Sequence, residues 1–352
     1  MVNLALYQKG LGHEIWMGCE RGRSLERSAG YRGFSILEGM KLDGRFHPIQ
    51  ISRDISALSE HIRKIRPDVI HCHLNHDHWI AGLARRKAKS RCRIVRTIHR
   101  YKKPYSDPLH RFLFQGMTDS LIVPSQAMKK IVLQVYPRVK NRIHVVYGGV
   151  NLEKFNPGVS GAGIRKQLGI PEDAVVGGVV SRIREDRGFQ WLFRSLKILF
   201  EKTDSGIVMI AGKGEMKRQI QQWIKEPPFA GRVIMAGYRS RDLANAYAAM
   251  DFSIFIAHGS EGSCRAVMEA MACGRPVVGL NRGVVPENIN PGETGYIVQP
   301  DNDEDLAEKL KIMFQKKEEL KNMGRAARLN AEKRFRLMAQ AEKTVQLYRE
   351  LF

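Results

Sequence analysis

The sequence predicts an α/β protein with two Rossmann-like, doubly wound domains that face a cleft. Its 352 residues are more than a domain with a single hydrophobic core usually contains, which favours two domains. From about residue 68, short apolar runs alternate with longer amphipathic stretches, which is the pattern of parallel βα units. Glycine and proline interrupt this pattern at 148–169, and a second series follows. We therefore expect ligands at the carboxyl ends of the strands.

The first series predicts buried strands joined by helices. The helical spacing of apolar residues predicts helices within 55–65, 77–89 and 127–135, with Ser125 as an N-cap of the last. The expected strands are 69–73, 94–99, 120–124 and 143–147.

The second series predicts its own doubly wound sheet. Its expected strands are 175–180, 207–211, 233–236, 252–256 and 277–279. After Asp301 the chain is charged and lacks proline, so we expect helices to the end.

The positive charge is concentrated in the first half. The net charge is +22, of which +16 lies in residues 1–150 and +6 in residues 151–352. Such a field attracts polyanions, including anionic lipid, a phosphorylated acceptor or nucleic acid. A general excess of solvated lysines is the alternative, but the asymmetry favours an anionic partner.

The remaining global features predict a cytoplasmic protein. The five cysteines are spread out and form no C-x-x-C pair, so neither a disulfide framework nor a zinc ribbon is indicated. No apolar run reaches the length of a spanning helix, and the amino terminus lacks the pattern of an export signal.

The loop and helix at 261–269 carry the first candidate site. A glycine-containing loop that enters a helix near Ser263 presents free N–H groups and the positive end of the helix dipole, which suit a phosphate. Glu269 can accept hydrogen bonds from the two ribose hydroxyls, and Glu261 precedes the helix. Because glutamates are common in helices, this pair alone is a weak signal.

Two arginines form the second candidate site. Arg182 and Arg187 follow the first strand of the second series, where two guanidinium groups can clamp a diphosphate through charge-assisted hydrogen bonds. Solvated surface arginines are the alternative, but a place at the mouth of a parallel sheet favours ligand binding.

An ordered series of motifs over nearly the whole chain resembles the retaining nucleotide-sugar glycosyltransferases of family four, which have the GT-B fold. The matching pieces are Gly-His-Glu-Ile at 12–15, Pro-Asp-Val-Ile-His-Cys-His at 67–73, Thr-Ile-His at 97–99, the segment at Ser125, Gly-Val-Asn at 149–151, Phe-Asn-Pro at 155–157, Arg182 with Arg187-Gly188, Gly-Lys-Gly-Glu at 212–215, the Glu261 and Glu269 pair with Ala-Met-Ala-Cys-Gly-Arg-Pro at 270–276, Pro286-Glu287 and Gly-Glu-Thr-Gly at 292–295.

The resemblance implies three parts. Residues 1–157 would bind the acceptor, residues 158–337 would bind the nucleotide sugar, and a terminal helix at 338–352 would cross back to the first domain. Arginine at 187 replaces the usual lysine and keeps its charge, and Gly148-Gly149 replaces the usual Asn-Gly at the hinge.

The resemblance also implies residue roles. Arg182 and Arg187 would bind the diphosphate and Glu269 the ribose. His99 would lie on the sugar side of the cleft, with His73 and Ser125 on the acceptor side. The donor sugar and phosphate would be held by Gly212, Glu261, Gly262, Ser263, Cys264 and Arg265. Among these residues, His99, Arg182, Arg187 and Glu261 are the catalytic candidates.

The implied reaction transfers a sugar with retention of configuration and needs neither metal nor cofactor. The departing diphosphate needs preorganised positive charge, which two arginines and a helix amino terminus supply. The basic first half suggests an anionic or lipid-linked glycan acceptor at a membrane surface, as in lipopolysaccharide or other envelope glycan synthesis. The sequence does not determine the base, the sugar or the oligomeric state.

One departure concerns the first strand. Members of the family begin with a central strand and a glycine-rich loop, whereas this sequence begins within the helix that follows. We expect the first domain to lack that strand, with unpaired backbone groups as a result. Three explanations are open: a start downstream of the real one, a remodelled domain, and an inactive relative; we favour the first.

Three other interpretations compete. Histidines 71, 73, 76 and 78 with Cys72 and Asp77 are a possible metal cluster, but they fall on a strand face and the following turn, so we expect no metal site. Nucleic-acid binding is suggested by the charge, yet no helix-turn-helix, aromatic RNA-binding pattern or zinc finger is present, so no specific nucleic acid is expected. A catalytically inactive GT-B scaffold that binds a partner is the third.

Overall fold

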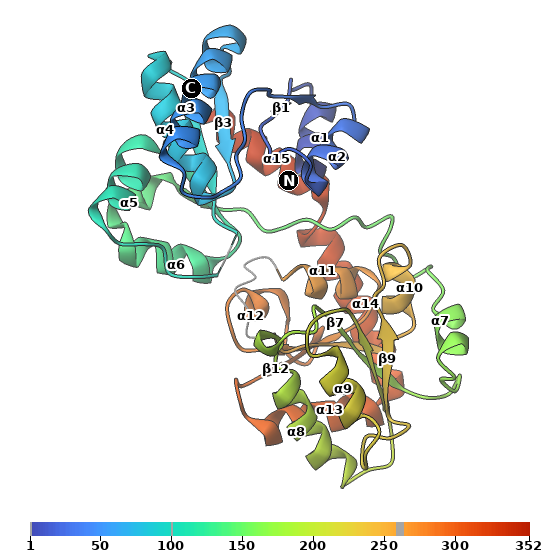
Figure 1. Ribbon diagram of the computed structural model, residues 1–352. Helices are drawn as coiled ribbons and strands as arrows, with labels where there is room; N and C mark the ends of the chain where they lie inside the picture. The colour runs from blue at the N-terminus through green and yellow to red at the C-terminus, as the bar shows by residue number, and fades with distance from the viewer. Residues whose placement is uncertain (1, 100, 258–263) are drawn as a thin grey trace. The chain divides into compact units, whose positions relative to one another are not determined.

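The computed structural model describes residues 2–99, 101–257 and 264–352, and the chain forms two compact units (Figure 1). Unit 1 comprises Met1–Gly148 with Leu337–Phe352, and unit 2 comprises Gly149–Arg336. Both are α/β units with parallel sheets, as the alternating pattern predicts.

The main sheet of unit 1 has four parallel strands in the order β3-β4-β5-β6 within the described residues. Each predicted strand is found within one or two residues of its expected ends. The strands are β3 (Val69–Cys72), β4 (Arg93–Thr97), β5 (Ser120–Val123) and β6 (Ile143–Val145), and the segments between them include α4 (Asn75–Ala88), α5 (Pro108–Phe112), η1 (Leu113–Met117), α6 (Gln126–Val135) and η2 (Pro137–Arg142). The interior strand β5 is buried throughout, whereas three of the four residues of the edge strand β3 are only half-buried.

A second, smaller sheet in unit 1 contains the two short parallel strands β1 (Trp16–Met17) and β2 (Ser35–Ile36). It does not pair with the main sheet in the part of the chain that the structure describes. The helices around it are α1 (Val2–Gly10), α2 (Ser24–Tyr31) and α3 (Pro48–Ile65).

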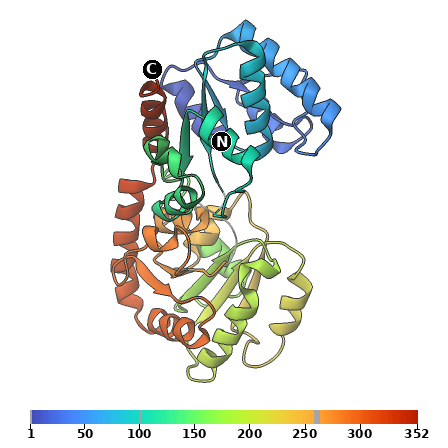
Figure 2. The ribbon, with the colours of Figure 1, turned by 90° about the vertical axis from the view of Figure 1, so that its left-hand side faces the viewer.

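The last helix, α15 (Leu337–Arg349), belongs to unit 1. It packs against α1, and Figure 2 shows the two helices next to each other at the C-terminal end of the chain. The Tyr348 hydroxyl lies 3.2 Å from Gln8 Nε2 and 2.5 Å from His71 Nδ1, so α15 ties α1 to β3. In the described residues, none of the helices is both long enough and apolar enough to span a bilayer.

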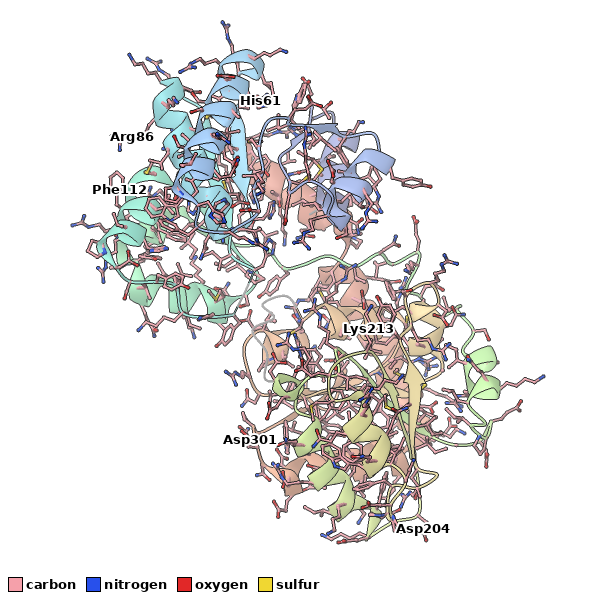
Figure 3. The ribbon with its side chains drawn as sticks, in the orientation of Figure 1. His61, Arg86, Phe112, Asp204, Lys213 and Asp301 are labelled. Carbon is pink, nitrogen blue, oxygen red and sulfur yellow. The ribbon has the colours of Figure 1, made fainter. Side chains whose placement is uncertain are left out.

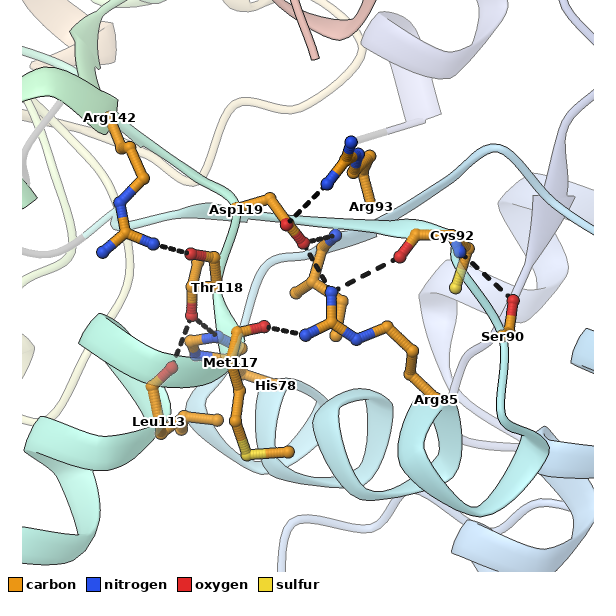
Figure 4. A network of polar contacts seen from close by, with 11 residues as sticks. His78, Arg85, Ser90, Cys92, Arg93, Leu113, Met117, Thr118, Asp119 and Arg142 are labelled. Carbon is orange, nitrogen blue, oxygen red and sulfur yellow. Dashed lines mark hydrogen bonds and ion pairs between the residues drawn. The ribbon is translucent and has the colours of Figure 1, made fainter. Parts of the chain in front are cut away.

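Several arginines of unit 1 serve the fold rather than a ligand (Figure 4). Asp119 accepts hydrogen bonds from Arg85 at 2.5 Å and from the N–H of Ile94 at 2.7 Å, and lies 3.4 Å from Arg93. Arg142 donates to the carbonyl of Thr118 at 2.7 Å. Part of the positive charge of the first half is therefore neutralised or hydrogen-bonded inside the unit.

Unit 2 has one continuous sheet of six parallel strands in the order β12-β11-β10-β7-β8-β9 within the described residues. The strands are β7 (Val176–Val180), β8 (Ile207–Ala211), β9 (Val233–Gly237), β10 (Phe252–Phe255), β11 (Val277–Leu280) and β12 (Gly295–Val298). The order reverses between β7 and β10, and the crevice at such a reversal is where open parallel sheets bind ligands.

The helices of unit 2 cover this sheet and enclose its core. They are α7 (Ala162–Gln167), α8 (Phe189–Phe200), α9 (Lys217–Trp223), α10 (Leu243–Ala248), α11 (Arg265–Ala272), α12 (Val285–Asn288), α13 (Asp303–Gln315) and α14 (Lys317–Arg334), with the short turn η3 (Glu185–Arg187) before α8. Helix α8 packs against α13, and α11 against α14. The core includes the buried side chains of Trp191, Phe252 and Phe314.

The hinge segment 149–157, which the sequence analysis placed in the first domain, packs in unit 2. Val150 donates to the carbonyl of Phe335 at 2.8 Å and pairs with Arg336 in an isolated bridge. The ring of Phe155 meets that of Tyr247 edge-on, with centroids 6.0 Å apart. The border of the compact units therefore follows Gly148.

Candidate active site

Arg182 lies just beyond the carboxyl end of β7, with its side chain exposed. The loop that carries it is bonded to the loop after β8, because Ser181 donates to the carbonyl of Ala211 at 3.1 Å and Ile183 to that of Lys213 at 2.9 Å. Glycine is needed at 212, where a Cβ atom would lie 1.9 Å from the carbonyl oxygen of Ser181. The predicted donor-site residue Gly212 therefore allows two loops to meet at the sheet edge.

Arg187 closes η3 directly before α8, with its side chain 14% exposed. Its Nε lies 3.6 Å from Asp186 Oδ1. Arg184 lies 3.4 Å from the same carboxylate oxygen and 3.9 Å from Glu215. The arginines after β7 thus lie among carboxylates that hold the loop together, while Arg182 projects to solvent.

Lys213 is a further cation at this edge, to which the sequence analysis gave no role. It follows β8, and Figure 3 labels it in unit 2. Its Nζ lies 4.0 Å from the centre of the Tyr238 ring, an arrangement that favours an ordered ammonium group. The Gly-Lys-Gly-Glu motif already contained this residue, so its position after a predicted strand was the signal for it.

Glu269 lies on α11, and its side chain is 8% exposed. Its Oε1 accepts from Arg265 Nε at 2.9 Å, and its Oε2 accepts from the Tyr247 hydroxyl at 3.2 Å. Burial raises the pKa of Glu269, while the charge of Arg265 opposes the shift. A carboxylate has about four acceptor positions, so two hydrogen bonds leave capacity for a ligand hydroxyl.

Tyr247 is the partner of Glu269 that the sequence did not reveal. It comes from α10 and is fully buried. Burial and the neighbouring Glu269 raise its pKa well above the usual value, so the hydroxyl stays protonated and donates. No spacing rule connects positions 247 and 269, which lie on different helices.

The loop before α11 holds the other predicted donor residues. Glu261, Gly262 and Ser263 lie outside the described residues. Helix α11 begins at Arg265, two residues later than expected, with buried Cys264 before it at a φ of 43°. The helix follows β10, so its amino end belongs to the crevice between β7 and β10.

Three histidines line up at the carboxyl ends of β3 and β4 in unit 1. His73 Nδ1 lies 2.9 Å from His99 Nε2, and the two rings stack with centroids 5.2 Å apart. His71 also stacks on His73, with ring centroids 4.3 Å apart. Thr97 Oγ1 lies 2.7 Å from His71 Nε2. The structure therefore brings the predicted residues His73 and His99 into direct contact.

These rings are neutral near pH 7. Burial lowers the pKa of His71 to about 3 and that of His99 to about 4, and it lowers the pKa of His73 well below the usual value. The bond between His73 and His99 needs one ring to donate and the other to accept, which two neutral rings can do. A neutral imidazole at His99 can offer one hydrogen bond to a sugar hydroxyl.

Ser125 has a structural contact. It is fully buried, and its Oγ accepts from the N–H of Met128 at 3.0 Å, so it caps α6 as the sequence predicts. Its hydroxyl is not exposed to solvent for an acceptor.

Among the residues that the structure describes, the other histidines form no metal centre with these rings. His78 is buried, with Nε2 2.8 Å from Thr118 Oγ1. Among residues 2–99, 101–257 and 264–352, no three His, Cys, Asp or Glu side chains are arranged to hold a metal ion.

Both halves of the chain match known protein families. Residues 162–330 match the family described as Glycosyl transferases group 1, and residues 1–154 match Glycosyltransferase Family 4. The chain belongs to the group 1 glycosyltransferases. The resemblance seen in the motifs is thereby confirmed over nearly the whole length.

Curated relatives and solved structures agree with this assignment. Spore coat protein SA of Bacillus subtilis is 24% identical over 89% of this chain and 87% of its own length. N-acetyl-alpha-D-glucosaminyl L-malate synthase of Bacillus anthracis is 27% identical over 84% of this chain and 77% of its own.

The solved structures confirm the GT-B fold. A glycosyltransferase from Rickettsia africae superposes with a TM-score of 0.87 at 21% identity, covering 99% of this chain and 93% of that one. Anabaena Alr3699/HepE in complex with UDP superposes with a TM-score of 0.84 at 18% identity, covering 99% and 96%.

Proposed function

We propose that this glycosyltransferase binds a nucleoside-diphosphate sugar in unit 2 and transfers the sugar with retention of configuration, without a metal ion. The observation that carries the donor site is the convergence of three elements at one sheet edge. Arg182 and Lys213 follow neighbouring strands β7 and β8, and α11 follows β10 on the other side of β7. The relative that binds UDP has the same fold.

Each group at this edge has a chemical task in the proposal. Arg182, Arg187 and Lys213 stabilise the negative charge that grows on the diphosphate as the sugar bond breaks. Glu269, held by Arg265 and Tyr247, accepts hydrogen bonds from the ribose hydroxyls. A departing diphosphate oxygen takes the acceptor proton, so the scheme assigns no carboxylate nucleophile.

His99 is the proposed contact of unit 1 with the sugar. Its neutral ring, fixed by the bond to His73, can bind a hydroxyl without repelling the cationic character of the reacting sugar. A protonated ring would add positive charge close to an oxocarbenium-like centre. We therefore assign His73 the task of orienting His99.

We further propose an anionic, lipid-linked acceptor at the cytoplasmic face of a membrane, with envelope glycan synthesis as the setting. The support is an apolar–basic patch, a group of exposed side chains on α4, on α5 and on the segment before α5. Its apolar members are Leu83, Tyr105, Leu109 and Phe112, which are 37%, 58%, 67% and 49% exposed, and its basic members are Arg86, Lys102, Lys103 and Arg111.

The patch has the composition of a membrane-surface site. Arg86 lies over the Phe112 ring at 6.0 Å, and Figure 3 labels both on the same part of unit 1. Exposed aromatic and aliphatic side chains insert at the interface of a bilayer, while arginine and lysine bind anionic head groups.

The donor proposal is tested by thermal unfolding against a panel of nucleoside diphosphates and their sugars. We expect one nucleotide to raise the midpoint, because a ligand that binds only the folded state stabilises it. The shift should disappear in an Arg182→Ala, Glu269→Ala double variant. Lys202→Ala is the matched control, since Lys202 is exposed at the end of α8, which leads to the amino ends of the strands.

The same nucleotide panel, combined with assays of hydrolysis and transfer, distinguishes an active enzyme from an inactive scaffold. The divided sheet of unit 1 favours an inactive scaffold as the second candidate function. Nucleotide binding without hydrolysis or transfer for any sugar would support the scaffold, and absence of binding for every nucleotide would contradict the donor site itself.

A further inference from the structure

Arg96 is a buried cation near the carboxyl end of β4, and only 5% of the residue is exposed. Alternation along the strand directs its side chain to the same face of the sheet as Ile94, which packs in a cluster with Ala81 of α4. Val95 lies on the opposite face, in a cluster with Leu347 of α15. The guanidinium group is therefore enclosed between β4 and α4.

Few hydrogen bonds compensate the cost of burying this charge. Arg96 Nη2 donates to Asn75 Oδ1 at 2.9 Å, whereas Nε and Nη1 have no hydrogen-bond partner among the described residues. A guanidinium group has five N–H donors, and a buried charge with few partners is costly. An apolar side chain of similar length would pack at this place at lower cost. The fold alone therefore does not require a cation here.

The hydrogen bond to Asn75 fixes the turn that follows β3. Asn75 is the first residue of α4, and His73 lies in the turn between β3 and this helix. Asp77 holds the same turn, because its carboxylate accepts from the N–H of His73 at 3.1 Å and from that of Leu74 at 2.9 Å. Arg96 and Asp77 thus hold the backbone that carries the His73 ring.

The turn in turn positions the imidazole pair, which consists of His73 and His99. His73 Nδ1 lies 2.9 Å from His99 Nε2, so a displacement of the His73 backbone would break the bond that orients the His99 ring. Two neutral rings can make this bond in either direction, whereas two protonated rings have only donors and repel each other. The bond therefore depends on the place of the turn and on the charge of the rings.

The charge of Arg96 acts on the same pair. Burial is the main cause that lowers the pKa of His73 and that of His99, and the positive charge of Arg96 lowers both further. A like charge nearby disfavours the protonated form of a ring. The neutral state of the imidazole pair therefore depends on a group of β4 as well as on burial.

The other titratable groups around the pair come from β3, α15 and α4. His71 stacks on His73 and is neutral, since burial lowers its pKa to about 3. Tyr348 bonds to His71 and stays protonated, because burial raises its pKa. Burial raises the pKa of Asp77 and the charge of Arg96 lowers it, and the Asp77 oxygens bind N–H groups of the turn. Arg96 is the member of this group that stays charged at every working pH.

We propose that Arg96 is a positioning residue of the imidazole pair: it holds the turn with His73 through Asn75, and its buried charge keeps the His99 ring neutral for the sugar. The assignment rests on the proposed contact between His99 and the sugar. It requires no contact between Arg96 and substrate, and it gives the buried cation a use that packing alone does not.

The test is an NMR titration of the histidine Cε1–Hε1 signals of the full chain with isotope-labelled histidine. Arg96→Met removes the charge and keeps the length, Arg96→Gln removes the charge and keeps a polar group, and Arg96→Lys keeps the charge. Arg91→Met is the matched control, since Arg91 is exposed shortly before β4 and its loss changes the net charge equally. His73→Gln and His99→Gln assign the two signals.

We expect the pKa of His99 to rise from about 4 to about 5 when the charge at position 96 is removed. At pH 5, about half of the His99 rings would then be protonated, against about a tenth in the unmodified chain. Arg96→Lys and Arg91→Met should leave the pKa unchanged. An unchanged pKa in folded Arg96→Met or Arg96→Gln would overturn the proposal, as would an equal rise in Arg96→Lys.

Asn75→Ala tests the hold on the turn separately. It leaves the charge of Arg96 in place, so we expect faster amide exchange at His73 and Leu74 with the pKa of His99 unchanged. Unchanged exchange would overturn this part of the proposal. Neither measurement needs a substrate, so failure of the Arg96 assignment is distinct from failure of the donor site, which the nucleotide panel tests.

Discussion

The two units differ in how complete their sheets are. Unit 2 has one six-stranded sheet in which β7, β8, β10 and β11 are buried almost throughout, whereas the strands of unit 1 are divided into sheets of four and two. The proposed donor-binding residues follow strands of the continuous sheet, and His71 and His73 line a cavity in unit 1. We therefore expect substitutions in unit 1 to leave donor binding unchanged, and we expect unit 1 to unfold locally more readily than unit 2.

The largest expected effect is on nucleotide binding in unit 2, when the Arg182 side chain is removed. Arg182→Ala should weaken nucleoside-diphosphate binding by about 10- to 100-fold, because a hydrogen bond to a charged group is worth about 1.5–3 kcal/mol. Calorimetric titration measures the change. Lys202→Ala should bind like the unmodified chain, and equal losses in both variants would show that general charge rather than the β7 edge attracts the nucleotide.

The apolar–basic patch tests unit 1 separately. Leu109→Ser with Phe112→Ser should reduce sedimentation with anionic vesicles by about tenfold, since each side chain loses apolar contact with the bilayer. Nucleotide binding in unit 2 should be unchanged. Tyr31→Ser is the matched control, because Tyr31 is 94% exposed on α2. Retention of the double variant on vesicles at low salt would remove the support for membrane docking there.

The hydrogen bond from Tyr247 to Glu269 can be tested by removing the Tyr247 hydroxyl. Tyr247→Phe should weaken nucleotide binding by about fivefold, the value of one ordinary hydrogen bond. The Tyr247 bond lowers the pKa of Glu269, so its loss should also move the pH below which binding weakens to a higher value.

Titrating nucleotide affinity between pH 5 and pH 8 checks this, with Tyr296→Phe as control on β12. A uniform loss of affinity at every pH would mean that Tyr247 acts only through packing.

The smallest expected effect is a loss of stability in unit 1 as the pH falls. The pKa of His71 is about 3 in the fold against an ordinary 6.5, so the neutral ring stabilises unit 1 fully above pH 6.5 and less as pH falls toward 3. Ten of the eleven histidines lie in residues 1–148. Lowering the pH from 7 to 5 should therefore reduce the amide protection factors, corrected for the intrinsic exchange rate at each pH, in unit 1 more than in unit 2.

His71→Gln should reduce this difference, while His47→Gln, at an exposed position, should preserve it. An equal loss of protection in both units would contradict a histidine origin.

Most strands were predictable because they are continuous apolar runs flanked by turns. Strands β3 to β11 lie within two residues of the expected ends. The two-residue strands β1 and β2 are too short to leave a period, and β12, which begins at Gly295 with a φ of 151°, was not predicted. Tertiary contacts rather than local patterns create these elements.

The site was predictable to the extent that it follows strand ends. Arg182, Gly212 and Glu269 lie at or beside the crevice of unit 2, where the pattern placed them. The contact between Arg265 and Glu269 follows from their i, i+4 spacing. Tyr247 could not be found, because its contact with Glu269 joins two helices with no shared period. Ser125 was predicted on the acceptor side and stays a prediction there; its buried hydroxyl accepts from the N–H of Met128 and caps α6, the role that the local sequence predicted.

The central claim is that unit 2 holds the donor at the carboxyl edge of β7, β8 and α11. Hydrogen exchange of the full chain with and without UDP tests it most directly, with unit 1 as the internal reference. We predict slower exchange in 181–188, 211–216 and 265–269, and no change in β3 to β6. Two results would contradict the claim: protection by UDP only in unit 1, or protection in unit 2 only outside these three segments.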